Sequence, residues 1–220
     1  MIPKIIHQIW IGPDPLPEYC SKFCDDIKHM HEELGYEYHL WGNELQDKYQ
    51  DDIYIQQYVK CKDLMPCFIK DRYMLLLLRD YGGIGLDVDC KIVRSFDNIL
   101  NKLHSDITYF AGTRFGDNAG ALIECTVQGS TPNSRIIQRV LEVYEEDDMD
   151  FVPGGGTFST KINQELDTDV VLLNYRYFFG HYDEDFDEII LHHDEHRLFS
   201  WKKDDEDYKD LAYKGQDNED

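Results

Sequence analysis

Pairs of aspartates separated by one residue are the pattern in this sequence with the clearest chemical potential. Such a pair can hold one divalent cation between hard oxygen ligands and leave coordination positions open for phosphate oxygens. The chain has 29 Asp among 220 residues, so about four pairs are expected by chance, and six occur. Five of them lie in acidic or flexible-looking stretches that are typical of solvated surface: Asp148/Asp150, Asp167/Asp169, Asp183/Asp185, Asp185/Asp187 and Asp205/Asp207.

The sixth pair, Asp87/Asp89, has a different context. It follows the apolar segment 84–86, which predicts a core strand, and open α/β sheets place ligands at the carboxyl ends of their strands. Two carboxylates at this position repel each other and are costly to bury unless a cation neutralises them. The pair therefore indicates either a metal site or a strand-end turn with solvated acids.

The elements before this pair predict a parallel arrangement. The apolar run 4–11 predicts a buried strand, and the spacing of large apolar residues over 19–34 predicts a helix that Gly35 ends. Alternation over 36–40 predicts the next strand. Strand, helix and strand in this order favour a right-handed crossover in a parallel sheet.

The rest of the chain continues this alternation. A helix is predicted from Pro66 to Gly82–Gly83 and another over 134–144, with strands near 108–111, 170–173 and 189–191 and an apolar stretch at 119–123. We expect a single α/β domain over residues 1–203. The acidic segment 204–220 is expected to be a disordered tail.

Composition narrows the class of protein. Lys and Arg number 22 against 44 Asp and Glu, a net charge of -22, which argues against binding nucleic acid or an anionic membrane. No stretch approaches the roughly 18 apolar residues of a membrane span, and the amino terminus does not resemble a signal peptide. The six cysteines form no CxxC pair and are expected to be free or buried thiols in a reducing compartment. We therefore expect a cytoplasmic protein without a transmembrane segment.

Two blocks of sequence resemble a known family. The segment IPKIIHQIWIG at 2–12, and Asp71 with YGGIGLDVD at 81–89, resemble the signature blocks of glycosyltransferase family 32. That family includes capsular-polysaccharide-type enzymes, fungal mannosyltransferases and, distantly, the catalytic domains of large glucosylating toxins. Weaker matches follow in order at 118–119, 129–132, 153–155, 192–193 and 200–201.

The resemblance implies a fold and an activity. The fold is GT-A type α/β, with a single Rossmann-like, mainly parallel sheet flanked by helices. The activity is metal-dependent, retaining transfer of a hexose or related sugar from a nucleotide-diphosphate sugar to a glycan or other hydroxyl acceptor, as in polysaccharide biosynthesis. The implied cofactor is Mn²⁺, with Mg²⁺ as an alternative, and UDP- and GDP-sugars are both compatible donors.

The resemblance also implies roles for residues in the two main blocks. Trp10 would stack on the nucleobase of the donor, with Ile9 in the adjoining strand, and Asp71 would hold hydroxyls of the donor sugar. Asp87 would contact ribose or sugar and assist the metal, and Asp89 would be the direct metal ligand.

Further roles fall on the later matches. His192 or His193 would supply a late metal ligand or a diphosphate contact, and because neighbouring residues of a strand face opposite sides, at most one of them should face the site. Ser200 and Trp201 would close over the diphosphate. Asp117 and Asn118 are the nearest candidates for the side chain beneath the reacting carbon, and Asn118 could equally satisfy the backbone of a turn.

Two positions depart from the family pattern. The family usually has an arginine at position 74, where this chain has Met74, and a tyrosine at position 85, where it has Gly85. Arg72 is the nearest arginine and is a candidate donor contact, but it points to a different helix face from residue 74. The departures leave open a catalytically weakened protein that binds a sugar nucleotide or a glycan.

Other chemistry is less well supported by the residues. His7 lies inside an apolar strand, which favours a hydrogen-bonded core histidine over a ligand. The glycine-rich segment 154–157 lacks the Gly-Lys-Ser/Thr of a phosphate loop. A phosphohydrolase that uses Asp87 as nucleophile is disfavoured because Cys90 and Lys91 follow the pair.

Overall fold

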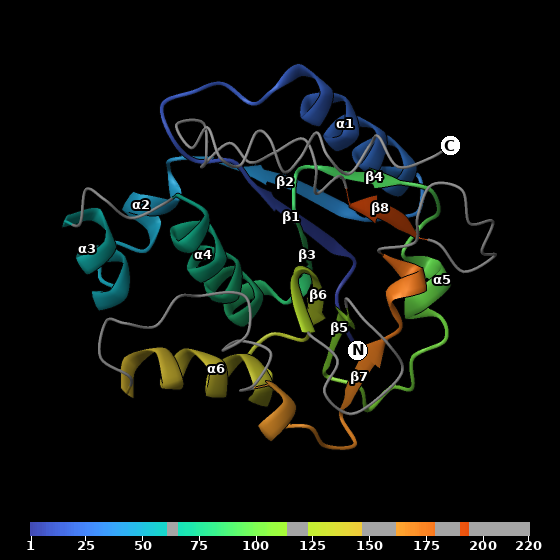
Figure 1. Ribbon diagram of the computed structural model, residues 1–220. Coiled ribbons are helices and arrows are strands. Elements are labelled where there is room, and N and C mark those ends of the chain that lie inside the picture. The colour runs from blue at the N-terminus through green and yellow to red at the C-terminus, as the bar shows by residue number, and fades with distance from the viewer. Residues whose placement is uncertain (61–65, 114–122, 147–161, 179–189, 194–220) are drawn as a thin grey trace, which may run out of the picture.

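The computed structural model describes residues 1–60, 66–113, 123–146, 162–178 and 190–193 (Figure 1). Its elements, in chain order, are β1 (Ile5–Ile9), α1 (Glu18–Glu32), β2 (Glu37–Trp41), α2 (Leu45–Lys48), α3 (Ile53–Lys60), α4 (Pro66–Tyr81), β3 (Gly83–Leu86), β4 (Cys90–Ile92), α5 (Asp97–Leu100), β5 (Tyr109–Thr113), β6 (Ile123–Ser130), α6 (Arg135–Glu146), β7 (Val170–Leu173), a 3-10 turn (Tyr175–Tyr177) and β8 (Leu191–His193).

Six strands form one sheet in the order β2-β1-β3-β6-β5-β7. The strand β1 pairs in parallel with both β2 and β3, and β5 pairs in parallel with β7. Only β6 runs against its neighbours β3 and β5 in this sheet, so the expected mainly parallel α/β architecture is confirmed. A second, two-stranded antiparallel sheet of β4 and β8 revises the expectation of a single sheet.

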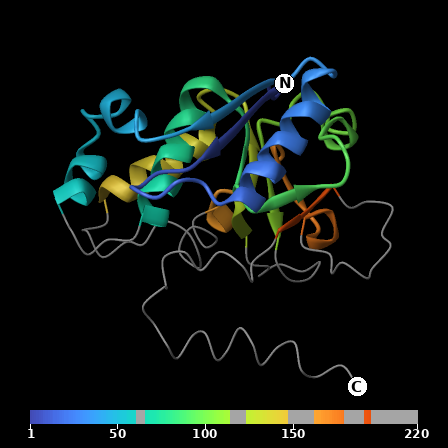
Figure 2. The same ribbon diagram turned by 90° about the horizontal axis from the view of Figure 1, so that it is seen from above.

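The sheet separates two hydrophobic cores. On one side α4 and α6 pack against it, and their core includes Leu75, Leu77, Ile136 and Ile137. On the other side lie α1, α5 and the small β4-β8 sheet, with Ile27, Phe96 and Leu191 among the core residues. Figures 1 and 2 show the strands running between these two layers of helices. Alternating side chains of the strands fill both cores, as expected for a sheet that is covered on both faces.

The turn between α4 and β3 requires glycine. Gly82 has a φ of 65° and Gly83 has a φ of 96°. Residues with a Cβ rarely adopt positive φ angles of this kind. A Cβ at residue 82 would also press on Pro132, and one at residue 83 on the backbone of Ile5. The predicted end of the helix at this glycine pair is confirmed, and the tight turn starts β3 directly beside β1.

The main difference from the sequence-based prediction is β6, of which only the first residue was included in an apolar stretch. This strand is central in the sheet, yet its buried side chains include Thr126, Gln128 and Ser130. They are satisfied locally: Tyr109 Oη donates to Gln128 Oε1 at 3.0 Å, and the Ser130 and Ser134 hydroxyls are 2.7 Å apart. Polar residues at core positions hid the strand from hydrophobic periodicity.

The predicted acidic tail, 204–220, lies outside the described residues. Within the described ranges, no helix combines the length and the apolar character that crossing a bilayer requires.

Candidate functional site

Two neighbouring strand ends bring the two main sequence blocks together. β1 and β3 are parallel, with Ile6 opposite Ile84 and His7 opposite Gly85, so both strands end at the same edge of the sheet. Trp10 follows β1, and the pair Asp87/Asp89 follows β3. The half-buried ring of Trp10 packs against a small cluster of Cys20, Cys24 and Val88, and Val88 is the residue between the two aspartates.

The backbone of Asp87 is fixed from two directions. Its carbonyl oxygen accepts a 2.9 Å hydrogen bond from Nε2 of Gln8, and its N–H donates to the Thr126 carbonyl at 3.1 Å. Gln8 is fully buried and in turn accepts a 2.7 Å hydrogen bond from the Tyr38 hydroxyl. Sequence reasoning missed Gln8, although a polar residue within an apolar strand was the available signal.

Lys70 links helix α4 to the turn after β3 that carries Asp87, and sequence reasoning missed this residue as well. Its ammonium lies 2.6 Å from Asp87 Oδ1 and 2.8 Å from Asp71 Oδ1. The exposed fraction of the side chain is 18% for Lys70, 21% for Asp87 and 13% for Asp71. Solvent therefore screens these ion pairs less than it screens ion pairs on the surface. Asp71 and Asp87, which were predicted from separate parts of the motif, therefore share one cation.

Burial and neighbouring charges shift the ionisation of this cluster. The pKa of Asp71 is raised to about 6, chiefly because the carboxyl group is buried. Lys70 lowers this pKa in part, and repulsion from the Asp87 carboxylate raises it further. Burial alone would lower the pKa of Lys70, but the Asp71 and Asp87 carboxylates raise it well above its usual value. The Cys125 thiol lies 3.8 Å from Asp71 Oδ2 as a donor. At neutral pH, Lys70 is charged and Asp71 is mostly ionised.

Asp89 is buried, with 7% of its surface exposed, and immediately precedes β4. In the small sheet, Cys90 lies opposite His193 and Lys91 opposite His192. The fold therefore brings the backbone of the late histidine pair beside the residues that follow Asp89. The side chains of His192 and His193 lie outside the description, so the choice between them stays a prediction.

Arg72 belongs to a different environment. Its Nη2 lies 2.7 Å from Asp52 Oδ2, its guanidinium lies over the Tyr54 ring, and 2% of its side chain is exposed. Asp52 also accepts a hydrogen bond from the N–H of Ile55 and so caps α3. The structure places Arg72 in a buried ion pair with the residue that caps α3, so a contact between Arg72 and the donor stays a prediction that this burial disfavours.

The two departures from the family pattern meet in space. A Cβ at Gly85 would overlap the Met74 thioether, and Met74 is itself 3% exposed. The side chain at position 74 therefore fills the volume that any side chain at position 85 would need. The two replacements form one packing unit between α4 and β3.

The other predicted residues divide into two groups. Ile9 is 2% exposed and belongs to the core beneath α4. It therefore anchors β1, the strand that Trp10 follows. Asn118, Ser200 and Trp201 lie outside the described residues, and their roles stay predictions.

The carboxylates at the strand ends fit a divalent cation in part. Asp87 and Asp89 supply the hard oxygen ligands that Mn²⁺ and Mg²⁺ accept. Among the described residues, no group of three or more His, Cys, Asp or Glu side chains could hold a metal ion. A metal here therefore requires further ligands from phosphate oxygens, water or residues beyond the described ranges, which suits an open site.

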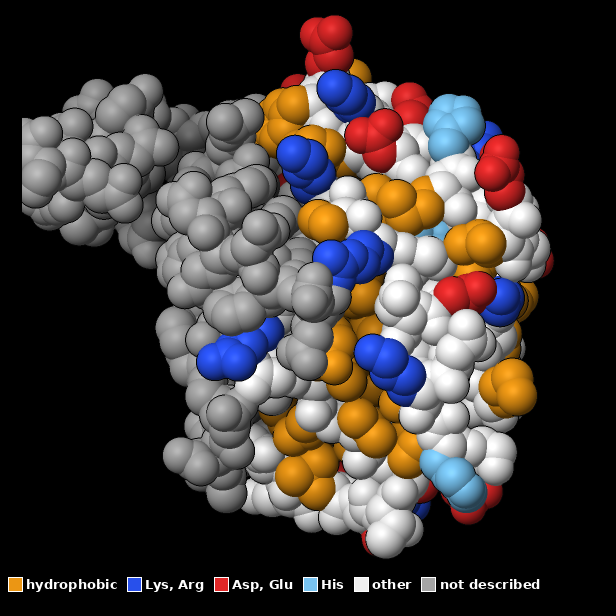
Figure 3. All heavy atoms as spheres, turned by 90° about the vertical axis from the view of Figure 1, so that its right-hand side faces the viewer, with side chains coloured by type: hydrophobic (Ala, Val, Ile, Leu, Met, Phe, Trp, Pro, Cys, Tyr) orange, Lys and Arg blue, Asp and Glu red, His pale blue; other side chains and the backbone are white. Residues whose placement is uncertain are grey.

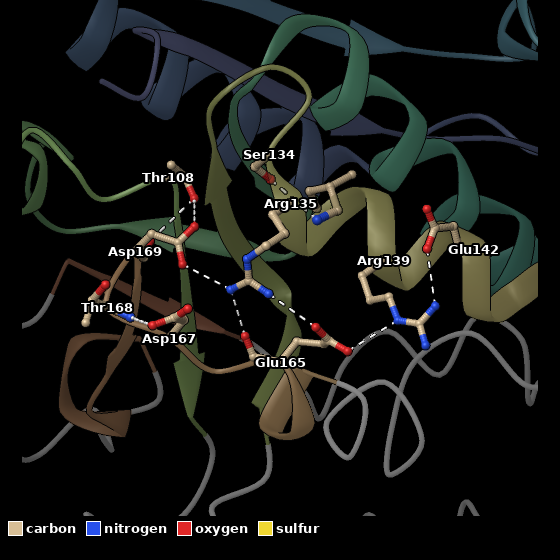
Figure 4. Close-up of polar contacts among 10 residues, drawn as sticks. Thr108, Ser134, Arg135, Arg139, Glu142, Glu165, Asp167, Thr168 and Asp169 are labelled. Carbon is tan, nitrogen blue, oxygen red and sulfur yellow. Dashed lines mark hydrogen bonds and ion pairs between the residues drawn. The ribbon is translucent and has the colours of Figure 1, made fainter.

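A second Asp-x-Asp pair that the structure describes has a structural role (Figure 4). Asp169 Oδ2 accepts a 2.6 Å hydrogen bond from Thr108, and its Oδ1 lies 3.1 Å from Arg135 on α6. Asp167 Oδ1 accepts a hydrogen bond from the N–H of Thr168. The sequence placed this pair in an acidic or flexible-looking stretch, whereas the structure shows Asp169 in a turn before β7, where it fastens β7 to α6.

His7 is a satisfied core histidine, as predicted. Nε1 of Trp41 donates to His7 Nδ1 at 3.1 Å, which leaves His7 Nε2–H to donate to the Gly82 carbonyl at 2.9 Å. Burial lowers its pKa to about 4. His7 is therefore neutral at pH 7 and holds β1 and β2 to the glycine turn after α4.

Solved structures that match most of the chain are glycosyltransferases. The PaToxG glycosyltransferase superposes with a TM-score of 0.58 at 20% identity, covering 75% of this chain and 70% of that chain. A glycosyltransferase involved in the glycosylation of the major capsid of PBCV-1 gives 0.53 at 11% identity, covering 86% and 92%. An active-site mutant of LgtC gives 0.53 at 12% identity, covering 86% of each chain.

These similarities establish the fold. The chain has the GT-A type α/β fold that the sequence blocks predicted. No protein-family model matches the chain, and no curated protein matches it by sequence. Membership of glycosyltransferase family 32 therefore stays a prediction.

Proposed function

We propose that the protein is a metal-dependent, retaining glycosyltransferase. It transfers a hexose or related sugar from a nucleotide-diphosphate sugar, with UDP or GDP as the nucleotide, to a glycan or another hydroxyl acceptor. The observation that carries this proposal is the placement of Trp10 and of the Asp87/Asp89 turn directly after two adjacent parallel strands, where Trp10 packs against the cluster that contains Val88, in a fold shared with glycosyltransferases.

Trp10 is the proposed platform for the nucleobase. Its indole Nε1 donates a 2.9 Å hydrogen bond to the Asp14 carbonyl, which restrains the ring while part of it stays accessible. Stacking of a base on an aromatic ring contributes about 1–3 kcal/mol in single-stranded nucleic-acid complexes, a fair guide to the contribution here. Residues after β1 therefore bind the donor at its nucleoside end.

The carboxylates bind the other end of the donor. Asp71 would accept hydrogen bonds from hydroxyls of the donor sugar, and Asp87 would contact ribose or sugar and assist the metal. Asp89 would be the direct ligand of the Mn²⁺ or Mg²⁺. When bound, the cation neutralises diphosphate oxygens and the charge that grows on the departing diphosphate. Because Asp71, Asp87 and Asp89 are assigned to the donor and the metal, we assign acceptance of the proton from the acceptor hydroxyl to the departing phosphate oxygen in a same-face attack.

The test is turnover against a panel of UDP- and GDP-sugars with Mn²⁺. We expect release of the nucleoside diphosphate from at least one donor, by hydrolysis or transfer, and a donor-dependent rise in melting temperature. Asp89→Asn should abolish both, while Asp167→Asn, in the pair that fastens β7 to α6, should leave them unchanged. Absence of turnover and of any thermal shift with wild-type protein across the panel would contradict the proposal.

A second function is favoured by one observation. Met74 and Gly85 pack against each other at the positions where the family usually has a charged and an aromatic residue. A protein that binds a sugar nucleotide or a glycan without turning it over is therefore the alternative. It would give a donor-dependent thermal shift that requires Asp89, with no release of nucleoside diphosphate.

A further inference from the structure

Lys70 is a mostly buried cation placed between two of the proposed donor-binding carboxylates. Its Nζ lies 2.6 Å from Asp87 Oδ1 and 2.8 Å from Asp71 Oδ1. A single carboxylate would satisfy the charge of one lysine, so the second contact calls for an explanation beyond the stability of α4. The geometry fixes both acids relative to the same helix.

We infer that Lys70 is a positioning residue that reserves Asp87 for the donor and leaves Asp89 as the main ligand of the divalent cation. This inference rests on the proposed function. An ammonium 2.6 Å from Asp87 Oδ1 uses part of the capacity of that oxygen and opposes a second cation there by charge repulsion.

The backbone of Asp87 strengthens this assignment. Gln8 and Thr126 hold its carbonyl and its N–H, so the backbone that carries the carboxylate is fixed relative to β1 and β6. Asp71 is held by the same ammonium and lies on α4 beside Lys70. The two carboxylates are thereby presented together to hydroxyl groups of a donor.

The charge balance of the site agrees with one metal ion. Lys70 offsets one of the three charges of Asp71, Asp87 and Asp89, so two negative charges remain for one divalent cation. The helix offers no replacement at the next turn of this face, because Met74 is uncharged and packs on Gly85. Without Lys70, Asp71 and Asp87 would repel each other and would attract a cation to their own position.

The experiment compares Mn²⁺ affinity, in the absence of any donor, between wild type and Lys70→Met. Removing the positive charge that lies beside Asp87 should tighten Mn²⁺ binding about tenfold, the size expected for repulsion between like charges that water screens. Electron paramagnetic resonance of free Mn²⁺ measures this affinity directly. The apparent Kd for the sugar nucleotide that wild type prefers in the panel should rise at least about tenfold, because Asp71 and Asp87 lose their fixed positions.

Matched variants separate charge from folding. Lys70→Arg keeps the charge and should bind Mn²⁺ like wild type, while Lys70→Gln provides a second neutral variant if Lys70→Met does not fold. Lys28→Met removes an exposed lysine that pairs with Glu32 on α1 and should leave Mn²⁺ affinity within twofold. Circular dichroism and a thermal melt check folding in each case.

The outcomes distinguish the inference from the proposed function. Wild type that turns over a donor, together with neutral Lys70 variants whose Mn²⁺ affinity is unchanged or weaker, would overturn the role of Lys70 alone. Wild type that neither binds Mn²⁺ nor turns over a donor would overturn the proposed function, and the inference with it.

Discussion

Two buried side chains near the strand ends, His7 and Lys70, respond to burial in opposite ways. His7 meets two hydrogen-bond partners that suit its neutral form, Trp41 and the Gly82 carbonyl, so it stays uncharged. Lys70 meets two carboxylates and stays charged. The surrounding partners, rather than burial itself, decide whether each side chain belongs to the scaffold or to the proposed site.

The neutral state of His7 predicts acid sensitivity. Because its pKa is lowered to about 4 in the folded state, the unfolded chain binds a proton that the folded chain does not between about pH 6.5 and pH 4. Above about pH 6.5, the neutral state of His7 therefore contributes about 3 kcal/mol to the free energy of unfolding, and this contribution is lost as the pH falls to about 4. Asp71, whose pKa is raised, acts in the opposite direction, so a variant is needed to isolate His7.

Urea unfolding of wild type and His7→Gln at several pH values provides the measurement. The glutamine cannot take up the proton, so wild type should exceed the variant in free energy of unfolding at pH 7, and the difference should shrink towards pH 4. A difference that stays constant with pH would show that His7 does not titrate as described.

At the scale of elements, helix α4 has two faces with different tasks. One face packs Arg72 against Asp52 of the α3 cap, and another presents Lys70 and Asp71 towards the turn after β3. Met74 lies one turn after Lys70 and fills the space over Gly85. Close packing of α4 on β3 therefore sets the distance between the helix carboxylate and the strand-end carboxylates.

Gly85→Ala tests this packing. The added methyl group overlaps Met74, and overpacking of a core typically costs about 1–3 kcal/mol. In a Met74→Ala background the same substitution should cost less than about 1 kcal/mol, since the overlapping side chain is gone. Urea unfolding of wild type, both single variants and the double variant measures the coupling. Additive effects would contradict the described contact.

For the whole molecule, the net charge of -22 bears on how an anionic donor can bind. Figure 3 shows that the Lys and Arg side chains of one face stand apart among hydrophobic and polar side chains. Several of the described cations are engaged in ion pairs, including Arg135 and Arg139 on α6 (Figure 4). The proposed divalent cation would supply local positive charge that this face does not concentrate.

Removal of divalent cations tests whether the protein needs a metal ion to bind the anionic donor. EDTA should abolish the rise in melting temperature caused by the preferred donor, which at 100 times its Kd corresponds to about 2.7 kcal/mol of stabilisation. Added Mn²⁺ should restore the rise, whereas NaCl at equal ionic strength should not. A rise that persists in EDTA would show that the chain binds the diphosphate without a metal.

The sequence alone predicted β1, α1, β2, α4, β3, β5, α6 and β7 in their order, and it placed Trp10 near the end of β1 and the Asp87/Asp89 pair after β3, because apolar periodicity and glycine turns are local signals. It did not predict helices α2, α3 and α5. It could not reveal β6, whose buried polar residues find their partners on neighbouring strands and the following turn, nor the bounds of β8, predicted over 189–191 and found at Leu191–His193.

Tertiary structure decided which side chains share the candidate site. Lys70 and Arg72 are two residues apart and carry the same charge, yet one meets Asp87 and the other meets Asp52. Gln8 and Asp87 are distant in sequence and are joined only because β1 and β3 are neighbours. Contacts between residues that are distant in the sequence depend on how helices and strands pack, and local sequence patterns do not determine that packing.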